Sequence, residues 1–314
     1  MNIDQLTFEN LPVEEAARLV ESGGPLVGVF PINGTRRWYL LKVMDGQFDA
    51  DGDSYLHVME QQHIAMYRLF FDHGVHTLLT PIFGADLLER GDDYIQMAVH
   101  GISRLVTEPH FLQFYEDYQV RVRFYGDCRR NLANTPYAYL IEQFEQIAEK
   151  TRSHDRNRLF FGMFANDPSE QIAEYSVRYY QEHRCAPDRR TLVQMYYGEY
   201  VDPVSFFIGF DRLSAFDMPL LATGNEDLYF TVSPSLDLTA RQLRQILYDH
   251  LFTRKTPEPD YETLSPDDLA WMQSFYAANH ERTLGLGELM GGIWYPIPEE
   301  AWPSDTTPNP GEHR

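Results

Sequence analysis

One short segment of the 314-residue chain contains the residue types that bind phosphate. The sequence Asn33-Gly34-Thr35-Arg36-Arg37-Trp38 directly follows an apolar run at residues 26–30. Gly34 lets backbone amides approach a ligand closely, Thr35 adds a hydroxyl, and the two arginines offer charge-assisted hydrogen bonds to phosphate oxygens. This chemistry fits a diphosphate. The same residues also fit a surface turn whose arginines pair with some of the 47 acidic residues.

The overall charge limits the partners that the chain can bind. The formal net charge is −21, which would repel nucleic acid and anionic lipid over most of the surface. We therefore expect no nucleic acid partner, and local arginines and backbone amides must hold any anionic ligand. Apolar runs of about eighteen residues are absent, and residues 1–4 lack the features of a signal peptide. We expect a cytoplasmic protein without stable membrane insertion.

The cysteines and histidines indicate no metal chemistry. Cys128 and Cys185 are too few for a disulfide framework and too far apart in sequence for a four-ligand zinc site, so we expect two reduced thiols. The 11 histidines form no His-Glu-x-x-His pattern, which leaves a zinc hydrolase without support. The arginine-containing segments therefore remain the places where chemistry is expected.

Strands and helices alternate along the chain, and this order predicts the fold class. Helices are expected over residues 12–20, 54–73 (with Ser54 as N-cap), 86–106, 136–152, 169–183 and 239–252. Strands are expected over residues 26–30, 75–82, 120–125, 159–164, 204–208 and 228–232. We predict a single α/β domain with a mostly parallel central sheet of about six strands flanked by helices. Ligands of such sheets bind outside the carboxyl ends of the strands, where the Asn33–Trp38 segment lies.

The Asn33–Trp38 segment resembles the phosphate loop of cis-prenyltransferases, which reads Asp-Gly-Asn-Gly-Arg-Trp. It is still more similar to the variant Asp-Gly-Thr-Arg-Arg-Trp of the mycobacterial diterpene synthase branch. In the family an Asp at the first position assists Mg²⁺ binding or departure of the leaving group, so the resemblance implies Mg²⁺ as the cofactor. Asn33 keeps the size of that residue but loses its charge and its basicity.

Further segments resemble the same family in order and spacing over nearly the whole chain: residues 73–80, 120–127, 159–167, 212–216 and 228–231. The last two match Arg-x-Ser-x-Phe and Leu-Tyr-Phe-Thr, and the family's Arg and Ser bind a second diphosphate. Arg212 and Ser214 by themselves also fit a capped turn. We assign residues 1–295 to a cis-prenyltransferase-like domain and the Pro- and acid-rich residues 296–314 to a mobile tail.

One departure from the family bears on the reaction. Before its Arg-x-Ser, a chain-elongating enzyme has another Arg and a Mg²⁺-binding Glu, whereas residues 206–211 read Phe-Phe-Ile-Gly-Phe-Asp. This difference argues against ordinary addition of isopentenyl diphosphate. The stretch Phe-Ile-Gly-Phe is similar to that of the mycobacterial diterpene synthase branch. The resemblance therefore implies a terpene synthase or terpenyl transferase that ionises an allylic, C20 diphosphate and passes the carbocation to water or a small nucleophile.

The resemblance also implies roles for individual residues and a homodimer. Catalytic roles fall on Asn33, on Tyr55, which corresponds to a tyrosine near the reacting carbon, and on Asp127. Diphosphate binding falls on Gly34, Thr35, Arg36, Arg37, Arg212 and Ser214, with Trp38, Asn166 and Phe210 as further candidates. Two alternatives remain open, a regular or irregular prenyl diphosphate condensing enzyme and a catalytically silent partner subunit of one.

Overall fold

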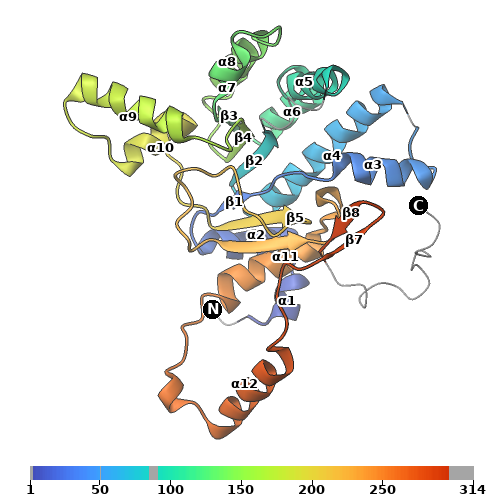
Figure 1. The fold of residues 1–314 in the computed structure, drawn as a ribbon, viewed down its shortest axis with the longest axis vertical. Coiled ribbons are helices and arrows are strands. Elements are labelled where there is room, and N and C mark those ends of the chain that lie inside the picture. Colours follow the sequence, from blue (N-terminus) through green and yellow to red (C-terminus); the bar gives the residue numbers. More distant parts are fainter. Residues whose placement is uncertain (1–2, 50, 85–90, 297–314) are drawn as a thin grey trace.

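A six-stranded parallel sheet forms the centre of the computed structural model, which describes residues 3–49, 51–84 and 91–296 (Figure 1). The strand order is β3-β4-β2-β1-β5-β6, and every neighbouring pair is parallel. The strands are β1 (Val27–Val29), β2 (Thr77–Phe83), β3 (Val120–Tyr125), β4 (Asn157–Met163), β5 (Phe206–Phe210) and β6 (Asp227–Thr231). The chain leaves β1 toward β2 and leaves β5 toward β6. Connections thus diverge between β1 and β5, and ligands of parallel sheets bind at such a point.

Helices cover both faces of the sheet, and a small hairpin follows them. The helices are α1 (Gln5–Glu9), α2 (Val13–Ser22), α3 (Thr35–Met44), α4 (Gly52–Asp72), α5 (Asp92–Thr107), α6 (Pro109–Asp117), α7 (Cys128–Leu132), α8 (Tyr139–Lys150), α9 (Ser169–His183), α10 (Arg189–Tyr197), α11 (Ala240–Tyr248) and α12 (Pro266–Asn279). The hairpin pairs β7 (Glu288–Met290) with β8 (Ile293–Tyr295) in antiparallel orientation. None of the helices in the described ranges is long and apolar enough to cross a membrane.

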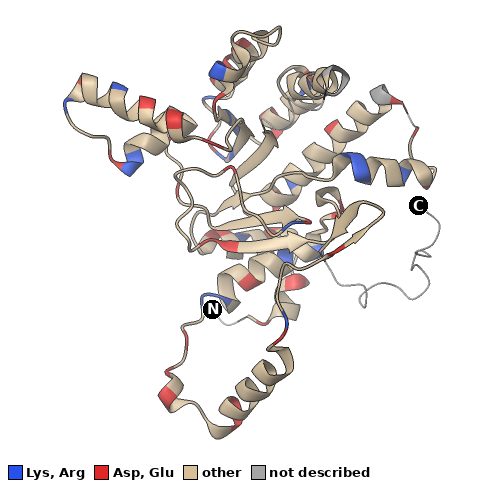
Figure 2. Ribbon diagram, in the orientation of Figure 1, with Lys and Arg blue, Asp and Glu red and all other residues tan. Residues whose placement is uncertain are grey.

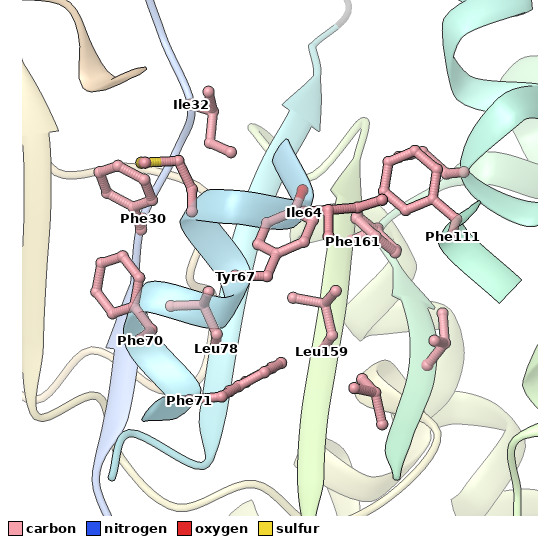
Figure 3. Packing of buried hydrophobic residues seen from close by; sticks show 14 of the residues in the cluster. Phe30, Ile32, Ile64, Tyr67, Phe70, Phe71, Leu78, Phe111, Leu159 and Phe161 are labelled. Carbon is pink, nitrogen blue, oxygen red and sulfur yellow. The ribbon is translucent and has the colours of Figure 1, made fainter. Parts of the chain in front are cut away.

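Successive side chains of the strands enter two separate cores, as the alternation of a strand requires. Phe206 and Ile208 of β5 belong to the larger core, which α4, α5, α6, α8 and α11 help to form. Phe207 between them belongs to the smaller core beneath α10. Figure 3 shows how Tyr67 and Phe71 of α4 pack near the strands in the larger core. Because both faces are buried there, the central strands β1 and β5 are continuous apolar runs, whereas the edge strand β3 alternates apolar residues with Arg121 and Arg123.

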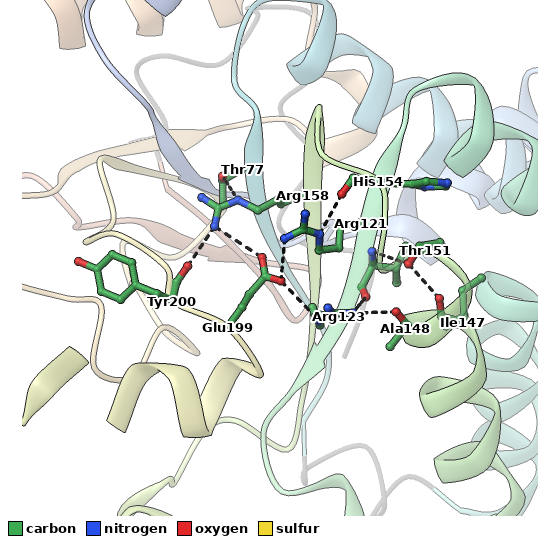
Figure 4. Close-up of polar contacts among 11 residues, drawn as sticks. Thr77, Arg121, Arg123, Ile147, Ala148, Thr151, His154, Arg158, Glu199 and Tyr200 are labelled. Atoms are coloured by element: carbon green, nitrogen blue, oxygen red, sulfur yellow. Dashed lines mark hydrogen bonds and ion pairs between the residues drawn. The ribbon is translucent and has the colours of Figure 1, made fainter. Parts of the chain in front are cut away.

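A half-buried ion network joins the segment after α10 to two strands (Figure 4). The Glu199 carboxylate lies 3.3 Å from Arg121, 3.4 Å from Arg123 and 3.6 Å from Arg158. Arg121 and Arg123 come from β3 and Arg158 from β4. Arg158 Nη1 also donates to the Tyr200 carbonyl at 3.0 Å. A carboxylate this well enclosed, at 16% side-chain exposure, is tolerated because three guanidinium groups surround it.

The sequence predictions agree with this architecture in fold class and strand number, with shifts at the ends of elements. Strand 120–125 and helix 169–183 have the expected bounds. The predicted N-cap Ser54 was wrong: Asp51 caps α4, and its side chain accepts from the Ser54 amide. Six helices were not predicted: α1, α3, α6, α7, α10 and α12. In α3 the apolar and charged residues are spread around the helix, so no amphipathic pattern marks it. The start of the helix expected at residue 86 and nearly all of the tail 296–314 lie outside the described residues.

Candidate active site

The β1–α3 turn (residues 33–37) lies at the carboxyl end of β1. A 3-10 turn, η2 (Ser235–Asp237), holds its backbone in place. The Asn33 amide donates to Ser235 Oγ at 3.0 Å, and the Ser235 amide donates to the Asn33 carbonyl at 3.1 Å. The fully buried Ser235 hydroxyl also donates to the Pro31 carbonyl. These bonds fix the turn from a segment some 200 residues later, which sequence reasoning did not identify.

Gly34 has a conformation and a neighbour that exclude any side chain. Its φ is +75°, in the left-handed region that glycine adopts without penalty. A Cβ at this position would lie 2.7 Å from Cε1 of Phe210 and 3.1 Å from Cβ of Pro234. The end of β1 therefore lies directly against the end of β5.

Helix α3 begins immediately after Gly34, so the turn presents a helix N-terminus. The first amides of a helix have no partner within it, and the helix dipole places partial positive charge there. Arg36 and Arg37 lie in this first turn, and Figure 2 shows the basic residues on α3. Anions bind readily at such a place. A protein with net charge −21 thus concentrates positive charge at one end of its sheet.

The loop after β5 approaches the same place. Arg37 Nη1 donates to Asp211 Oδ2 at 3.3 Å, and the Arg37 guanidinium carbon lies 5.2 Å from the centre of the Phe210 ring. Asp211 has a φ of +70°, and its amide donates to the Thr231 carbonyl at 3.1 Å. Sequence reasoning did not propose Asp211 as a site residue, although it directly precedes the Arg-x-Ser motif.

Arg212 and Ser214 follow on this loop and are exposed to the same cavity. The Ser214 amide donates to the Arg212 carbonyl at 2.8 Å, which shapes a tight turn. Among the residues that the structure describes, the Arg212 guanidinium has no hydrogen-bond or ion-pair partner. An unpaired guanidinium beside a helix N-terminus is well suited to an anionic ligand.

Tyr55 lies between the polar β1–α3 turn and the apolar part of the cavity. It lies in the first turn of α4, and its hydroxyl is 3.2 Å from the Thr35 hydroxyl. Tyr39 packs edge-on against the Tyr55 ring at a centroid distance of 5.0 Å. The Tyr55 hydroxyl thus lies beside the Thr35 hydroxyl of the β1–α3 turn, while the Tyr55 ring packs against Tyr39.

The cavity that these residues line has a volume of about 930 Å³. Its polar end contains the β1–α3 turn and Asp211, Arg212 and Ser214. Its other walls come from α4, α5, α6 and the end of β2, and their apolar side chains include Met59, Phe83, Met97, Ile102, Leu105 and Phe111. Cavities of this size and lining hold small molecules with a large apolar part.

The apolar walls contain one buried ionic cluster. Glu60 of α4 is 3% exposed, and its carboxylate accepts from Arg104 at 2.5 Å and contacts His110 Nδ1 at 2.8 Å. Arg104 also lies 3.0 Å from Glu108. Glu60, Arg104 and the nearby His63 all line the cavity, and burial lowers the pKa of His63, which favours its neutral form. Sequence reasoning missed this cluster because its members come from three helices.

The structure brings most of the predicted site residues to this cavity, but not all of them. Asn33, Gly34, Thr35, Arg36, Arg37, Tyr55, Asn166, Phe210, Arg212 and Ser214 line it. Trp38 is buried instead, and its Nε1 donates to Asp237 at 2.9 Å, so it anchors α3. Asp127 is not among the lining residues, and its carboxylate lies 3.2 Å from Arg130. The structure therefore separates Asp127 from the group with which it was predicted to act.

Comparison with solved structures shows which fold the chain has. The chain superposes on a probable undecaprenyl diphosphate synthase from Campylobacter jejuni with a TM-score of 0.52, at 16% identity, over 76% of this chain and 100% of that one. It also superposes on lavandulyl diphosphate synthase from Lavandula x intermedia with a TM-score of 0.54, at 13% identity, over 74% and 97% of the two chains. These likenesses, together with the sheet order, show the cis-prenyltransferase fold.

Comparison of sequences shows the family more closely. Over 295 residues the chain is 40% identical to the tuberculosinyl adenosine transferase of Mycobacterium tuberculosis (strain CDC 1551 / Oshkosh), covering 93% of this chain and 98% of that protein. It is 26% identical to (+)-kolavelool synthase of Herpetosiphon aurantiacus over 87% and 89% of the two chains. No protein-family model matches the chain. The chain belongs to the cis-prenyltransferase family that includes the tuberculosinyl adenosine transferase.

The buried Glu60–Arg104 pair gives a prediction about stability. Arg104→Leu leaves the Glu60 carboxylate buried without its main cation, and we expect the free energy of unfolding to fall by about 3–5 kcal/mol. Glu60→Leu/Arg104→Leu removes both charges, so we expect a smaller loss than for the single variant. Urea unfolding monitored by circular dichroism measures the difference.

Arg129→Leu is the matched control, because Arg129 pairs with Glu145 at 2.7 Å on an exposed surface. Its cost should stay below about 1 kcal/mol. Glu60→Leu is measured as the second single variant. A double variant that loses as much stability as Glu60→Leu and Arg104→Leu added together would show that the charges are not energetically coupled.

Proposed function

We propose that the protein is an enzyme that ionises an allylic diterpenyl (C20) diphosphate and transfers the carbocation to water or another small nucleophile, releasing pyrophosphate. The observation that carries this proposal is one cavity with a cationic end at the β1–α3 turn and apolar walls beyond it. Such a cavity fits a molecule with a diphosphate at one end and a hydrocarbon tail at the other. The names of the two sequence relatives, a tuberculosinyl transferase and a kolavelool synthase, support a diterpenyl tail.

The β1–α3 turn would act on the diphosphate. The α3 amides after Gly34, the Thr35 hydroxyl, and the Arg36 and Arg37 guanidinium groups bind its oxygens and stabilise the charge that develops on them. When the carbon–oxygen bond breaks, its electron pair leaves with pyrophosphate, and an allylic cation remains in the cavity. Interactions that strengthen as this charge develops lower the barrier to ionisation.

Tyr55 would lie beside the reacting carbon, a role supported by the 3.2 Å distance between its hydroxyl and the Thr35 hydroxyl. Its oxygen is placed to orient an incoming water or other nucleophile, and the nearby aromatic rings stabilise a cation through their faces. Capture by water forms a carbon–oxygen bond, and the proton leaves to solvent. The product in that case is a terpene alcohol, and with another nucleophile it is a terpenylated small molecule.

Mg²⁺ belongs to the same proposal as the cofactor, and when bound it neutralises charge on the diphosphate. No group of three or more His, Cys, Asp or Glu residues that could hold a metal occurs within the described part of the chain. This is compatible with Mg²⁺, which proteins often bind through one or two carboxylates together with substrate phosphates. We also propose a cytoplasmic location, and the free thiols of Cys128 and Cys185 suit its reducing conditions.

The direct test is incubation of the purified protein with Mg²⁺ and geranyl, farnesyl, geranylgeranyl or bicyclic diterpenyl diphosphate. Pyrophosphate release and product mass are measured, and we expect turnover with a diterpenyl substrate. Absence of turnover with every substrate would contradict the proposal and favour a silent partner subunit. Incorporation of labelled isopentenyl diphosphate into the product would instead indicate a condensing enzyme.

Arg212 gives a sharper prediction, because its guanidinium has no partner among the described residues. Arg212→Ala should change the free energy of unfolding by less than about 0.5 kcal/mol. We expect kcat/KM for the diterpenyl diphosphate to fall by about 100-fold to 1000-fold, the usual cost of removing a group that stabilises developing charge. The control Arg152→Ala removes an exposed guanidinium that does not line the cavity and should leave kcat/KM unchanged. Equal activity of the two variants would remove Arg212 from the site.

We further propose that the protein forms a homodimer and that a second copy covers helix α12. This helix has no buried residue, and Figure 1 shows it apart from the sheet. Trp271 is 70% exposed and Tyr276 63%, and the Trp271 and Phe275 rings stack at 5.5 Å. Light scattering should give twice the mass of one chain, and Trp271→Glu/Phe275→Glu should shift it toward one chain. A single-chain mass for the unaltered protein would contradict this proposal.

A further inference from the structure

The β1–α3 turn has an amide where the motif of cis-prenyltransferases has a carboxylate. An amide oxygen can contact Mg²⁺, but the Asn33 side chain contributes no negative charge to the ion. The function proposed above places a diphosphate and Mg²⁺ beside this turn. A carboxylate for the ion must therefore come from another element at the polar end of the cavity.

Asp211 lies at that end, on the loop after β5. It lines the cavity together with the β1–α3 turn, and it is joined to the turn through Arg37. Its φ of +70° is a conformation that non-glycine residues hold only at an energetic cost. The bond from its amide to the Thr231 carbonyl and the packing of the preceding Phe210 against Gly34 keep it there. Strain of this kind often accompanies a functional position.

Within the described structure, only one of the two Asp211 carboxylate oxygens has a hydrogen-bond partner. Oδ2 accepts from Arg37 at 3.3 Å, a long bond, while Oδ1 is buried and has no hydrogen-bond partner there. A buried carboxylate oxygen without a donor costs free energy, and such an atom requires an explanation. A cation beside Oδ1 would remove this cost.

We propose that Asp211 Oδ1 is the protein's carboxylate ligand for Mg²⁺ and replaces the carboxylate that the loop lacks at Asn33. The inference rests on the proposed diphosphate substrate. Asp211 then supplies one ligand and the diphosphate oxygens supply others, with water completing the set, which is the usual way in which Mg²⁺ is bound beside phosphates. Arg37 remains available to both Asp211 and the diphosphate.

A simpler role for Asp211 would be to neutralise Arg37, and the two roles have opposite consequences. If Asp211 only neutralises Arg37, Asp211→Asn frees the guanidinium, and pyrophosphate should bind more tightly while its dependence on Mg²⁺ stays the same. If Asp211 holds Mg²⁺, the same substitution removes the dependence on Mg²⁺. The quantity that separates them is the ratio of pyrophosphate dissociation constants without and with Mg²⁺.

The experiment is isothermal titration calorimetry of inorganic pyrophosphate into the full chain, with and without Mg²⁺. For the unaltered protein we expect Mg²⁺ to tighten binding by a factor between about 5 and about 150, the usual range for coupled sites. In Asp211→Asn this factor should fall to about 1, because the protein then has no carboxylate that holds Mg²⁺ beside the pyrophosphate. Asn33→Asp/Asp211→Asn returns a carboxylate to the turn and should restore the factor.

Asp45→Asn is the matched control, because Asp45 is an exposed carboxylate that caps the other end of α3. It should keep the factor of the unaltered protein, and thermal unfolding confirms that each variant is folded. An unchanged factor in Asp211→Asn would overturn this inference and leave the proposed function standing. Failure of pyrophosphate to bind the unaltered protein under either condition would contradict the proposed function itself.

Discussion

The contact between Gly34 and Phe210 is the constraint on which the candidate site depends. It brings the carboxyl end of β1 against that of β5, the two strands between which the connections of the sheet diverge. Because Gly34 has no side chain, the chain can adopt a positive φ there and turn directly into α3, which exposes the amides of its first turn. The same contact sets Asp211 and Arg212 opposite those amides. The helix N-terminus and the loop after β5, with their charges, are thus brought together where the Phe210 ring packs against the Gly34 backbone.

The polar end of the cavity carries unbalanced positive charge, whereas the ionic groups along its apolar walls are paired. At the polar end, the arginines and helix amides create a local positive field on a chain of net charge −21, which is what recognition of an anion by an acidic protein requires. Along the apolar walls, the Glu60 carboxylate and the Arg104 guanidinium are paired with each other. A paired cluster adds little net charge near a hydrocarbon tail, whereas an isolated carboxylate there would be costly.

The sequence predicted the fold class and most of the residues that line the polar end of the cavity, and physical reasons explain what it left out. Strands buried on both faces and glycine-terminated turns leave strong local signals, so the parallel sheet and the Asn33–Trp38 segment could be found. Ser235, Glu60 and Asp211 act through partners far away in the chain, and no local pattern marks such contacts. Asp127 was included through the resemblance of residues 120–127 to a strand of the family; it does not line the cavity, and its carboxylate pairs with Arg130.

The central claim is that one cavity holds a diphosphate at the β1–α3 turn and a diterpenyl tail between α4 and α5. The most direct measurement is a crystal structure with Mn²⁺ and an unreactive thiolo analogue of geranylgeranyl diphosphate. We expect phosphate density at the first turn of α3, anomalous density for Mn²⁺ beside Asp211, and tail density along Met59 and Ile102. Phosphate density away from α3, or a tail outside the cavity, would contradict the account.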